Sequence, residues 1–298
     1  MIVIHSFAGS DKGLVRPSNE DAFLLYAPEG EEIQWSKDLL AVVADGVGGA
    51  ACGDKASQLA VTTIRECYIQ SLNTRTAFSI RDSFRAANAA IHHAAANDTK
   101  CRGMATTCTA LVIHGNVGII GHVGDSRAYL FRNGELHQIT RDHTLVNSLV
   151  EEGLLSAEDA KDHPRKNVIV KALGHLPDVD LDVYNISIDK NDSFLLCSDG
   201  LYTLVPHDDI VEILRKFPVK DSGSKLIELA KSRGGIDNIT VVVLAFKEPE
   251  DFFENNTAIK TKPWVALSID KKAILLWLSI VTALLVLAAA FYYFTERY

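Results

Sequence analysis

The sequence lacks the cysteine pattern of a disulfide-stapled domain or of a zinc site. Its 298 residues contain five cysteines, at positions 52, 67, 101, 108 and 197. The number is odd, and no two of them have the CxxC spacing that structural zinc sites favour. We therefore expect buried, reduced thiols and neither a disulfide framework nor a zinc site.

An excess of basic charge is also absent. The chain carries 38 acidic and 30 basic residues, a formal net charge of −8. A general nucleic-acid binder needs a basic face to offset phosphate repulsion, so the composition disfavours a nucleic-acid partner. Hydrophobic residues make up 47% and charged residues 23%. This is globular composition, and it excludes a disordered chain and a coiled-coil rod.

Several widespread catalytic motifs are missing. The sequence has no GxxxxGK[ST] phosphate loop, no HExxH zinc-protease motif and no GxSxG nucleophile elbow. Its glycine-rich stretches, VADGVGG and GGIDN, do not have the glycine spacing of a dinucleotide-binding fingerprint. The chemistry must therefore come from another arrangement of residues.

Charge is absent from one long segment near the C-terminus. Residues 273–294 read AILLWLSIVTALLVLAAAFYYF. At about 1.5 Å of rise per residue, a helix of this length reaches ~33 Å, enough to cross a bilayer core. A buried core helix is the alternative, but it would carry a polar face, and only Ser279 and Thr282 are polar here. The segment is predicted to be a transmembrane helix.

The segments around this helix predict its topology. The N-terminus, MIVIHSFAGSDKG, has no basic and apolar succession typical of a signal peptide. Lys271 and Lys272 precede the apolar segment and favour the cytoplasmic side. We expect a main domain over 1–247 in the cytoplasm, a juxtamembrane linker over 248–272, the span over 273–294 and a short tail over 295–298. The protein would be a single-pass membrane protein anchored at its C-terminus.

The main domain shows the patterns of a mixed fold. Runs rich in Val, Ile, Leu and aromatic residues, bounded by Gly, Asp and Asn, predict strands at 2–7, 22–26, 39–44, 107–113, 117–123, 127–132, 181–188, 193–197 and 239–246. Apolar residues at helical spacing predict helices at 54–72, 77–97, 143–153, 207–216 and 221–233. Regular alternation of strands and helices is absent, so helices packed on antiparallel sheets are favoured over a doubly wound parallel sheet.

Carboxylates stand where the predicted strands begin or end. Each neighbours a glycine or a short polar turn, and the six are Glu20, Asp21, Asp45, Asp125, Asp199 and Asp237. An isolated Asp-Gly pair is most often only a turn. If the strands share one sheet edge, however, these carboxylates converge, and converging carboxylates repel one another unless a cation neutralises them.

Oxygen ligands of this kind indicate which cation is involved. Carboxylate and carbonyl oxygens suit Mg²⁺ or Mn²⁺ better than zinc. Gly46 follows Asp45, and the missing side chain lets its carbonyl approach an ion. Two ions about 3.5–4 Å apart lower the pKa of a bridging water and hold phosphate oxygens, which suits phosphoester hydrolysis. Arg16 lies four residues before Glu20 and is suited to bidentate phosphate binding.

Seven motifs in one order extend this interpretation. They are RPSNEDAF, VADGVGGAACGDKAS, MATTCTALVI, GHVGDSRAYLFRNGEL, ITRDHT, LLCSDGLYTLV and GGIDNITVVVL. Together they resemble the metal-dependent serine/threonine protein phosphatases of the type 2C class, in particular the bacterial branch. The resemblance covers residues 1–246, nearly the whole of the predicted main domain.

The resemblance implies a fold and a metal site. The fold is α+β, a four-layer α-β-β-α sandwich of two antiparallel sheets flanked by helix pairs, to which the sequence adds the C-terminal transmembrane helix. Asp45 would bridge two ions, with the Gly46 carbonyl on one of them and Asp199 and Asp237 on the other. The remaining roles fall to Glu20 and Asp21 as direct or water-mediated ligands, Asp125 for a third, weaker ion, Arg16 for substrate phosphate, and Asn238 for orienting Asp237.

Two features concern the reaction and its specificity. Animal members of the class place a histidine after the Asp-Gly pair, and Val47 stands there in this chain. The proton for the leaving group must then come from elsewhere. A metal-bound water near Asp125 is the first candidate and His143 the second, although a structural role for His143 is favoured. Residues 141–180 match the flap beside the active site in this class; the alternative is a plain surface insertion.

The expected function is hydrolysis of phosphoserine and phosphothreonine in proteins by a metal-activated water, without a covalent phosphoenzyme. The cofactor would be Mg²⁺ or Mn²⁺, two ions with a possible weaker third. The expected partners are phosphorylated proteins, a serine/threonine kinase pathway that the enzyme opposes near the membrane, and lipid around the C-terminal helix. Two alternatives are a phosphatase dedicated to one regulatory phosphoprotein and an inactive binding module that keeps the fold.

Overall fold

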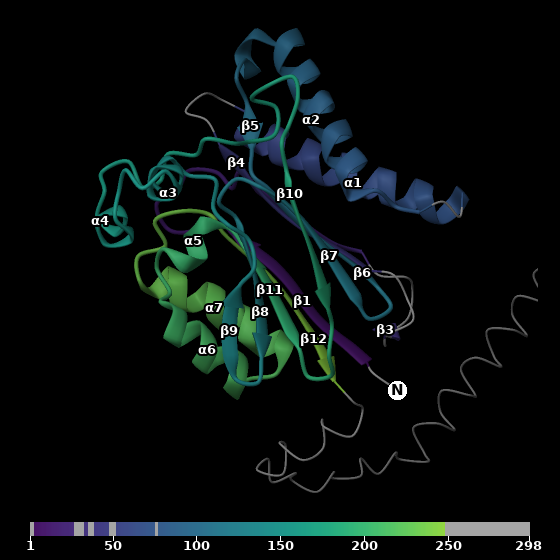
Figure 1. Cartoon of the computed structure of the whole chain (residues 1–298), viewed down its shortest axis with the longest axis vertical. Helices are drawn as coiled ribbons and strands as arrows, with labels where there is room; N and C mark the ends of the chain where they lie inside the picture. Colours follow the sequence, from purple (N-terminus) through teal and green to yellow (C-terminus); the bar gives the residue numbers. More distant parts are fainter. Residues whose placement is uncertain (1–2, 27–32, 35–38, 48–51, 75–76, 248–298) are drawn as a thin grey trace, which may run out of the picture. The chain divides into compact units, whose positions relative to one another are not determined.

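Two antiparallel β-sheets form the centre of the protein (Figure 1). The computed structural model describes residues 3–26, 33–34, 39–47, 52–74 and 77–247. The first sheet has the strand order β3-β1-β12-β11-β8-β9. Its strands are β1 (Val3–Asp11), β3 (Ile33–Gln34), β8 (Arg127–Arg132), β9 (Glu135–Gln138), β11 (Ser193–Cys197) and β12 (Ile239–Lys247).

The second sheet has the order β10-β7-β6-β4-β2, and the short β5 pairs with the end of β4. Its strands are β2 (Asp21–Tyr26), β4 (Leu39–Val47), β5 (Ala105–Thr106), β6 (Cys108–His114), β7 (Val117–Val123) and β10 (Asp182–Ser187). The chain crosses from one sheet to the other several times, including at β1–β2, β7–β8 and β10–β11. Arg16 and Glu20 lie in the β1–β2 connection, and Asp125 lies in the β7–β8 connection.

Helices cover the outer face of each sheet. In the second sheet, α1 (Gly53–Thr74) packs on β2 and β4, and α2 (Ile80–Asn97) lies against α1 and β7. In the first sheet, α6 (His207–Lys216) and α7 (Val219–Ser232) pack on each other, with α7 on β1 and β12. Four short helices complete the described chain: η1 (Thr99–Cys101), α3 (Leu145–Glu151), α4 (Ala157–Lys161) and α5 (Asp199–Tyr202).

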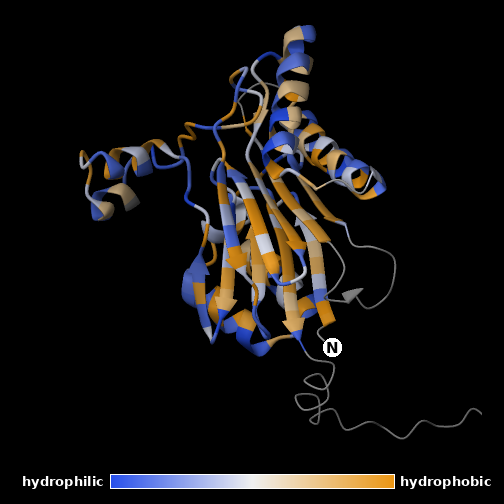
Figure 2. Cartoon of the chain, turned by 45° about the vertical axis from the view of Figure 1, so that its right-hand side comes forward, coloured by the Kyte–Doolittle hydropathy of each residue, from blue (hydrophilic) through white to orange (hydrophobic). Residues whose placement is uncertain are grey.

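The alternation of side chains along each strand explains the layers. In β4, Leu40 and Val42 pack into the cluster beneath α1 and α2, while Leu39, Ala41 and Val43 point into the space between the sheets. The same alternation in β12 divides its residues between the sheet interface and the cluster beneath α6 and α7. Successive side chains on a strand point to opposite faces, so strands that are apolar on both sides must be covered on both sides. Figure 2 shows the hydrophobic residues concentrated in these strands.

The segment between β9 and β10 extends away from the sheets as an arm carrying α3 and α4 (Figures 1 and 2). Thr144 caps α3 by accepting a hydrogen bond from the Asn147 amide, and Ser156 caps α4 in the same way through Asp159. Such caps satisfy amides that have no partner inside the helix. The arm is the segment expected to form a flap over 141–180.

The α+β sandwich of two antiparallel sheets and covering helices agrees with the sequence-based expectation. All nine predicted strands and all five predicted helices are present with small changes in their ends. Strands β3, β5 and β9 and helices η1, α4 and α5 were not predicted. Each has five residues or fewer, too short for a period in hydrophobicity to be recognised.

The expectation of five reduced thiols is wrong at two positions. Cys52 and Cys101 form a disulfide that joins the residue before α1 to the end of η1, with a sequence separation of 49. Cys67, Cys108 and Cys197 are free. The pair was missed because the two cysteines meet only through the packing of α1 and α2, which their spacing in the sequence does not reveal.

Within residues 3–247 as described, no helix is both long and apolar enough to cross a membrane. The predicted linker, transmembrane helix and tail lie outside the described residues.

Candidate active site

One pocket gathers the predicted site residues at the ends of both sheets. It has a volume of about 610 Å³. Its walls include Arg16, Glu20, Asp45, Gly46, Asp125, Asp199, Asp237 and Asn238. Asp21 is the one predicted site residue that does not line the pocket. The expected convergence of strand-end carboxylates therefore takes place, and it brings together residues separated by more than 200 positions.

Asp21 and Asp45 are paired directly across β2 and β4. Behind the pocket, the Oδ2 atom of Asp21 accepts hydrogen bonds from Ser198 Oγ at 2.7 Å and Thr240 Oγ1 at 2.6 Å. Its Oδ1 atom is buried without a hydrogen-bond partner. Asp21 thus links β2 of one sheet to the β11–β12 region of the other, and it retains an unused buried acceptor.

Glycines let the backbone pack tightly beside the two central aspartates. A Cβ atom on Gly46 would lie 2.3 Å from the Gly53 carbonyl oxygen, and one on Gly200 would lie 2.0 Å from the Asn238 carbonyl oxygen. Both distances are far shorter than atoms tolerate. Close backbone approach therefore requires glycine at positions 46 and 200, in addition to the room that glycine leaves for a ligand.

The helix that begins at Asp199 and the loop before β12 form another wall. Asp199 is the first residue of α5, and its Oδ1 atom is buried without a hydrogen-bond partner. The guanidinium of Arg16 donates to Asp237 Oδ2 at 2.6 Å. Half of the Arg16 side chain is exposed, 52%. This ion pair holds a cationic fork beside the carboxylates, where it can receive an anionic group.

The side chain of Asn238 holds the β1–β2 loop, while its backbone amide contacts the side chain of Asp237. Its Nδ2 group donates to the carbonyls of Lys12 and Ser18, both at 2.9 Å, and its Oδ1 accepts from the Glu20 amide at 2.8 Å. Only its backbone amide reaches Asp237, at Oδ1. The residue expected to orient Asp237 therefore fixes the position of Glu20 as well.

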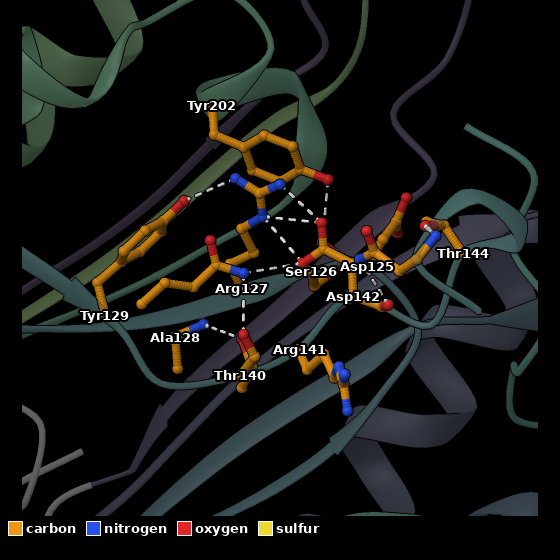
Figure 3. A network of polar contacts seen from close by, with 12 residues as sticks. Asp125, Ser126, Arg127, Ala128, Tyr129, Thr140, Arg141, Asp142, Thr144 and Tyr202 are labelled. Carbon is orange, nitrogen blue, oxygen red and sulfur yellow. Dashed lines mark hydrogen bonds and ion pairs between the residues drawn. The ribbon is translucent and has the colours of Figure 1, made fainter. Parts of the chain in front are cut away.

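Asp125 is held by a polar network between the sheets and α5 (Figure 3). The Arg127 guanidinium donates to both carboxylate oxygens of Asp142, at 2.9 Å and 2.6 Å, and stacks 3.5 Å from the centre of the Tyr202 ring. Tyr202 in turn donates its hydroxyl to the Asp125 carbonyl at 3.1 Å. This network was not predicted, although Asp142 lies within the ITRDHT motif.

Burial and mutual repulsion raise the pKa values of the clustered aspartates. Burial raises the pKa of Asp21 and of Asp199 to about 6. It raises the pKa of Asp125 to about 7, and the negative charge of Asp199 adds to the shift. Burial, followed by the charges of the other four aspartates, raises the pKa of Asp45 well above its usual value. Carboxyl groups this close to one another do not all ionise unless a nearby positive charge offsets their mutual repulsion.

The donor set fits divalent metal ions. Around the pocket the oxygens come from carboxylates and the Gly46 carbonyl, which are hard ligands of the kind that Mg²⁺ and Mn²⁺ prefer. The unpartnered, buried oxygens of Asp21 and Asp199 are acceptors that a cation would satisfy. Among the described residues, no three of these acidic, imidazole or thiol groups already stand in ligating geometry.

The arm forms the remaining wall of the pocket. The sequence predicted a flap here but not all of the residues that line the pocket. Asn167, Ile169, Val170, Lys171 and His175 line the pocket. Lys171 lies 2.7 Å from Asp180. The position of the arm agrees with a flap beside the active site, but His175 was not singled out, because a lone histidine in a polar segment carries no recognisable pattern.

His143 lies outside the lining of the pocket and has structural contacts. Its Nδ1 accepts a hydrogen bond from the Gly124 amide at 3.1 Å, and its Nε2 lies 3.3 Å from Asp182. The side chain is 8% exposed. The structural role favoured from sequence fits this environment better than proton donation to a leaving group.

Comparison with known proteins places this geometry in a family. A family model described as Protein phosphatase 2C matches residues 18–229. The chain is 35% identical over 246 residues to the serine/threonine phosphatase stp of Listeria monocytogenes, covering 81% of this chain and 95% of that protein. It is 41% identical over 244 residues to the serine/threonine protein phosphatase PstP of Mycobacterium tuberculosis, covering 81% of this chain and 45% of that protein.

Solved structures agree with these sequence matches. The catalytic domain of PstP in complex with two manganese ions superposes with a TM-score of 0.70 at 36% identity, covering 83% of this chain and 100% of that one. Stp1 from Staphylococcus aureus gives 0.71 at 30% identity, covering 82% and 95%. With the carboxylate pocket on the same two-sheet fold, these matches show that the chain belongs to the protein phosphatase 2C family and is a serine/threonine protein phosphatase.

Proposed function

We propose that this phosphatase acts on phosphorylated proteins at the carboxylate pocket with divalent metal ions, that residues 273–294 anchor it in the membrane, and that it opposes a serine/threonine kinase there. The observation that supports the catalytic part is the convergence of carboxylates from both sheets on one pocket beside Arg16. The membrane part rests on the uncharged sequence of residues 273–294.

The metal would be held by the oxygen ligands of the pocket. Asp45 and the Gly46 carbonyl would hold it from β4, Glu20 and Asp21 from β2 and the preceding loop, and Asp199 and Asp237 from the first sheet, with Asp125 available to a third ion. When bound, a pair of divalent ions lowers the pKa of a water and neutralises charge on phosphate oxygens. The raised pKa values of Asp21 and Asp199 support this assignment, because a nearby cation would stabilise their ionised forms.

The chain's own residues orient the phosphate and its attached peptide. Arg16 presents two parallel N–H groups, and its ion pair with Asp237 at 2.6 Å fixes their direction. The network of Arg127, Asp142 and Tyr202 keeps the Asp125 backbone at the pocket wall. Groups that are already oriented before the substrate binds lower the free-energy cost of stabilising charge in the transition state.

A serine/threonine kinase is the expected opposing activity, because the phosphatase has a substrate only where serine or threonine residues of proteins have been phosphorylated. Anchoring the enzyme beside a membrane-bound target would raise its effective concentration there. The two lysines before the span favour a cytoplasmic catalytic domain.

Deleting residues 273–298 tests the membrane part. The full chain should float with phospholipid vesicles in a density gradient, and the deletion variant should remain in the aqueous fraction. Hydrolysis of p-nitrophenyl phosphate should be equal in both, because every residue that lines the pocket lies between Arg16 and Asn238. Removal of residues 295–298 alone is the matched control and should leave flotation intact. Flotation of the variant without 273–298 would contradict the anchor.

A further inference from the structure

Three apolar side chains are exposed next to the Arg16–Asp237 pair. Leu14 and Val15 are each 65% exposed, and Ile236 is 49% exposed. Val15 directly precedes Arg16, and Ile236 directly precedes Asp237. We call Leu14, Val15 and Ile236 the apolar rim. Single exposed apolar residues are common on protein surfaces, but a cluster beside a functional pocket points to binding.

The two segments that carry the rim are attached to each other. The Leu14 amide donates to the Gly235 carbonyl at 2.7 Å. A Cβ atom on Gly235 would lie 3.0 Å from Leu14 Cγ, so the Leu14 side chain rests on that glycine. The Arg16–Asp237 ion pair joins the same two segments two residues further along. The rim is therefore continuous with the wall of the catalytic pocket.

Further contacts hold the rim in place. The Gly13 amide donates to Asp11 Oδ1 at 2.9 Å, and Lys231 of α7 donates to Asp11 Oδ2 at 2.7 Å. Gly13 has a φ of +75°, and a Cβ atom there would lie 2.2 Å from the Asp237 carbonyl oxygen. These contacts fix the backbone that carries the rim, so a binding partner meets it with little loss of backbone conformational freedom.

We propose that the apolar rim binds the segment of a phosphoprotein substrate that lies next to the phosphorylated residue, so that the enzyme favours substrates with an apolar side chain close to the phosphoserine or phosphothreonine. This inference rests on the proposed function of the pocket. An extended peptide advances by about 3.3–3.6 Å per residue. A phosphate held at Arg16 therefore brings residues within about three positions of the phosphorylated one to the rim.

The position of the apolar rim next to the catalytic pocket indicates what binds to it. A phosphoprotein whose phosphate reaches Arg16 also brings its flanking peptide to the neighbouring surface, where Leu14, Val15 and Ile236 are exposed. Val170 of the arm, which lines the pocket, is also exposed, at 41%. The arm thus adds an exposed apolar side chain to the lining of the same pocket.

The test compares phosphothreonine peptides with the full chain and Mn²⁺. One peptide has only serine and glycine around the phosphothreonine, and six others carry a single leucine at one of the three positions on either side. For at least one position, leucine should raise kcat/KM roughly tenfold, the effect of about half-burying one leucine side chain. The triple variant Leu14→Ser, Val15→Ser, Ile236→Ser should reduce this preference to less than twofold.

Controls separate recognition from catalysis. The triple variant should hydrolyse p-nitrophenyl phosphate as the unaltered enzyme does, because that compound has no peptide to contact the rim. Val117→Ser, which removes an exposed apolar side chain at the start of β7, should keep the leucine preference; Val117 is 39% exposed.

Several results would overturn the inference. Phosphopeptide hydrolysis without any leucine preference, or a preference that survives in the triple variant, would overturn it while leaving the phosphatase function intact. A dimer in analytical ultracentrifugation that the triple variant abolishes would assign the rim to self-association instead. Failure to hydrolyse both the peptides and p-nitrophenyl phosphate would overturn the proposed function together with the inference.

Discussion

Asp45 and Asp199 come from different sheets, yet each is followed by a glycine for the same reason. Gly46 lies against the backbone of Gly53, and Gly200 lies against the backbone of Asn238. The sequence predicted the aspartates because Asp-Gly follows an apolar strand in both places. It did not predict the neighbours that exclude a side chain, because those contacts join segments distant in sequence.

The burial of His122 could not be predicted from the sequence. The imidazole is fully buried between the sheets and the start of the arm. Its Nε2 lies 2.9 Å from the Arg141 carbonyl, and its Nδ1 lies 2.8 Å from Thr109 Oγ1. Nothing in the pattern GIIGHVGD distinguishes a buried histidine from an exposed one, because burial depends on how β7 and its neighbours pack.

Burial of His122 predicts a loss of stability in mild acid. Burial lowers the pKa of His122 to about 3, whereas an exposed histidine has a pKa of about 6.5. Between these values the unfolded chain binds a proton that the folded chain does not, so the free energy of unfolding falls as the pH falls from about 6.5 towards 3. From pH 7 to pH 5 this residue should account for a loss of about 2 kcal/mol.

Urea unfolding of the detergent-solubilised, metal-free full chain at pH 7 and pH 5 measures this effect. His122→Asn should lose about 2 kcal/mol less than the unaltered protein over that interval. His137→Asn replaces a half-exposed histidine in β9 and should keep the original pH dependence. Equal pH dependence for His122→Asn and the unaltered protein would show that His122 does not govern it.

At the scale of elements, the long strands and helices were predictable and the short ones were not. The run LLAVVADGV predicts β4 because every residue from Leu39 to Ala44 is apolar, which suits a strand covered on both faces. Strand β5 has two residues and exists because it pairs with Gly46 and Val47. Helix α5 has four residues. Tertiary contacts decide such elements, so local sequence does not predict them.

The disulfide ties α1 to the end of α2 through η1. It joins residues 49 positions apart and closes a loop that contains both long helices. Closing a loop of this size restricts the unfolded chain and typically stabilises a protein by about 2–4 kcal/mol. Cys101→Ser, or reduction of the unaltered protein, should therefore lower the free energy of unfolding by about that amount.

Unfolding of the full chain in urea, with and without dithiothreitol, checks this prediction. Dithiothreitol should destabilise the unaltered protein and leave Cys101→Ser unchanged. Cys67→Ser is the matched control, since Cys67 is free, and it should keep the response to dithiothreitol. Intact mass after alkylation should show two additional labelled thiols once the bond is reduced. An unaltered protein whose stability does not respond to dithiothreitol would contradict a stabilising bond.

At the scale of the whole molecule, the sequence predicted that carboxylates would meet but not how the two sheets bring them together. Asp21 and Asp45 lie opposite each other in the second sheet, whereas Asp199 and Asp237 flank β11 and β12 of the first. The pairing of strands across such distances is set by the packing of both sheets. The family resemblance supplied this architecture, because the sequence patterns indicate strands without specifying their partners.

The arm beside the pocket is a second feature of the whole molecule. Its polar sequence was open to two interpretations, a flap or a plain insertion. The structure places Lys171 and His175 in the pocket wall, so the arm helps to shape access to the site. The chemistry of the site therefore depends on elements contributed by both sheets and by the arm together.

The central claim is that the converging aspartates hold metal ions that make this pocket a protein phosphatase. The most direct measurement is phosphate release from a phosphothreonine peptide by the full chain over a range of Mn²⁺ concentrations, with Asp199→Asn and Asp208→Asn beside it. Asp208 is a fully exposed aspartate in α6 and serves as the matched control. Mn²⁺-dependent release should fall by roughly a hundredfold or more in Asp199→Asn and stay unchanged in Asp208→Asn. Release that needs no divalent metal, or that Asp199→Asn leaves intact, would contradict the account.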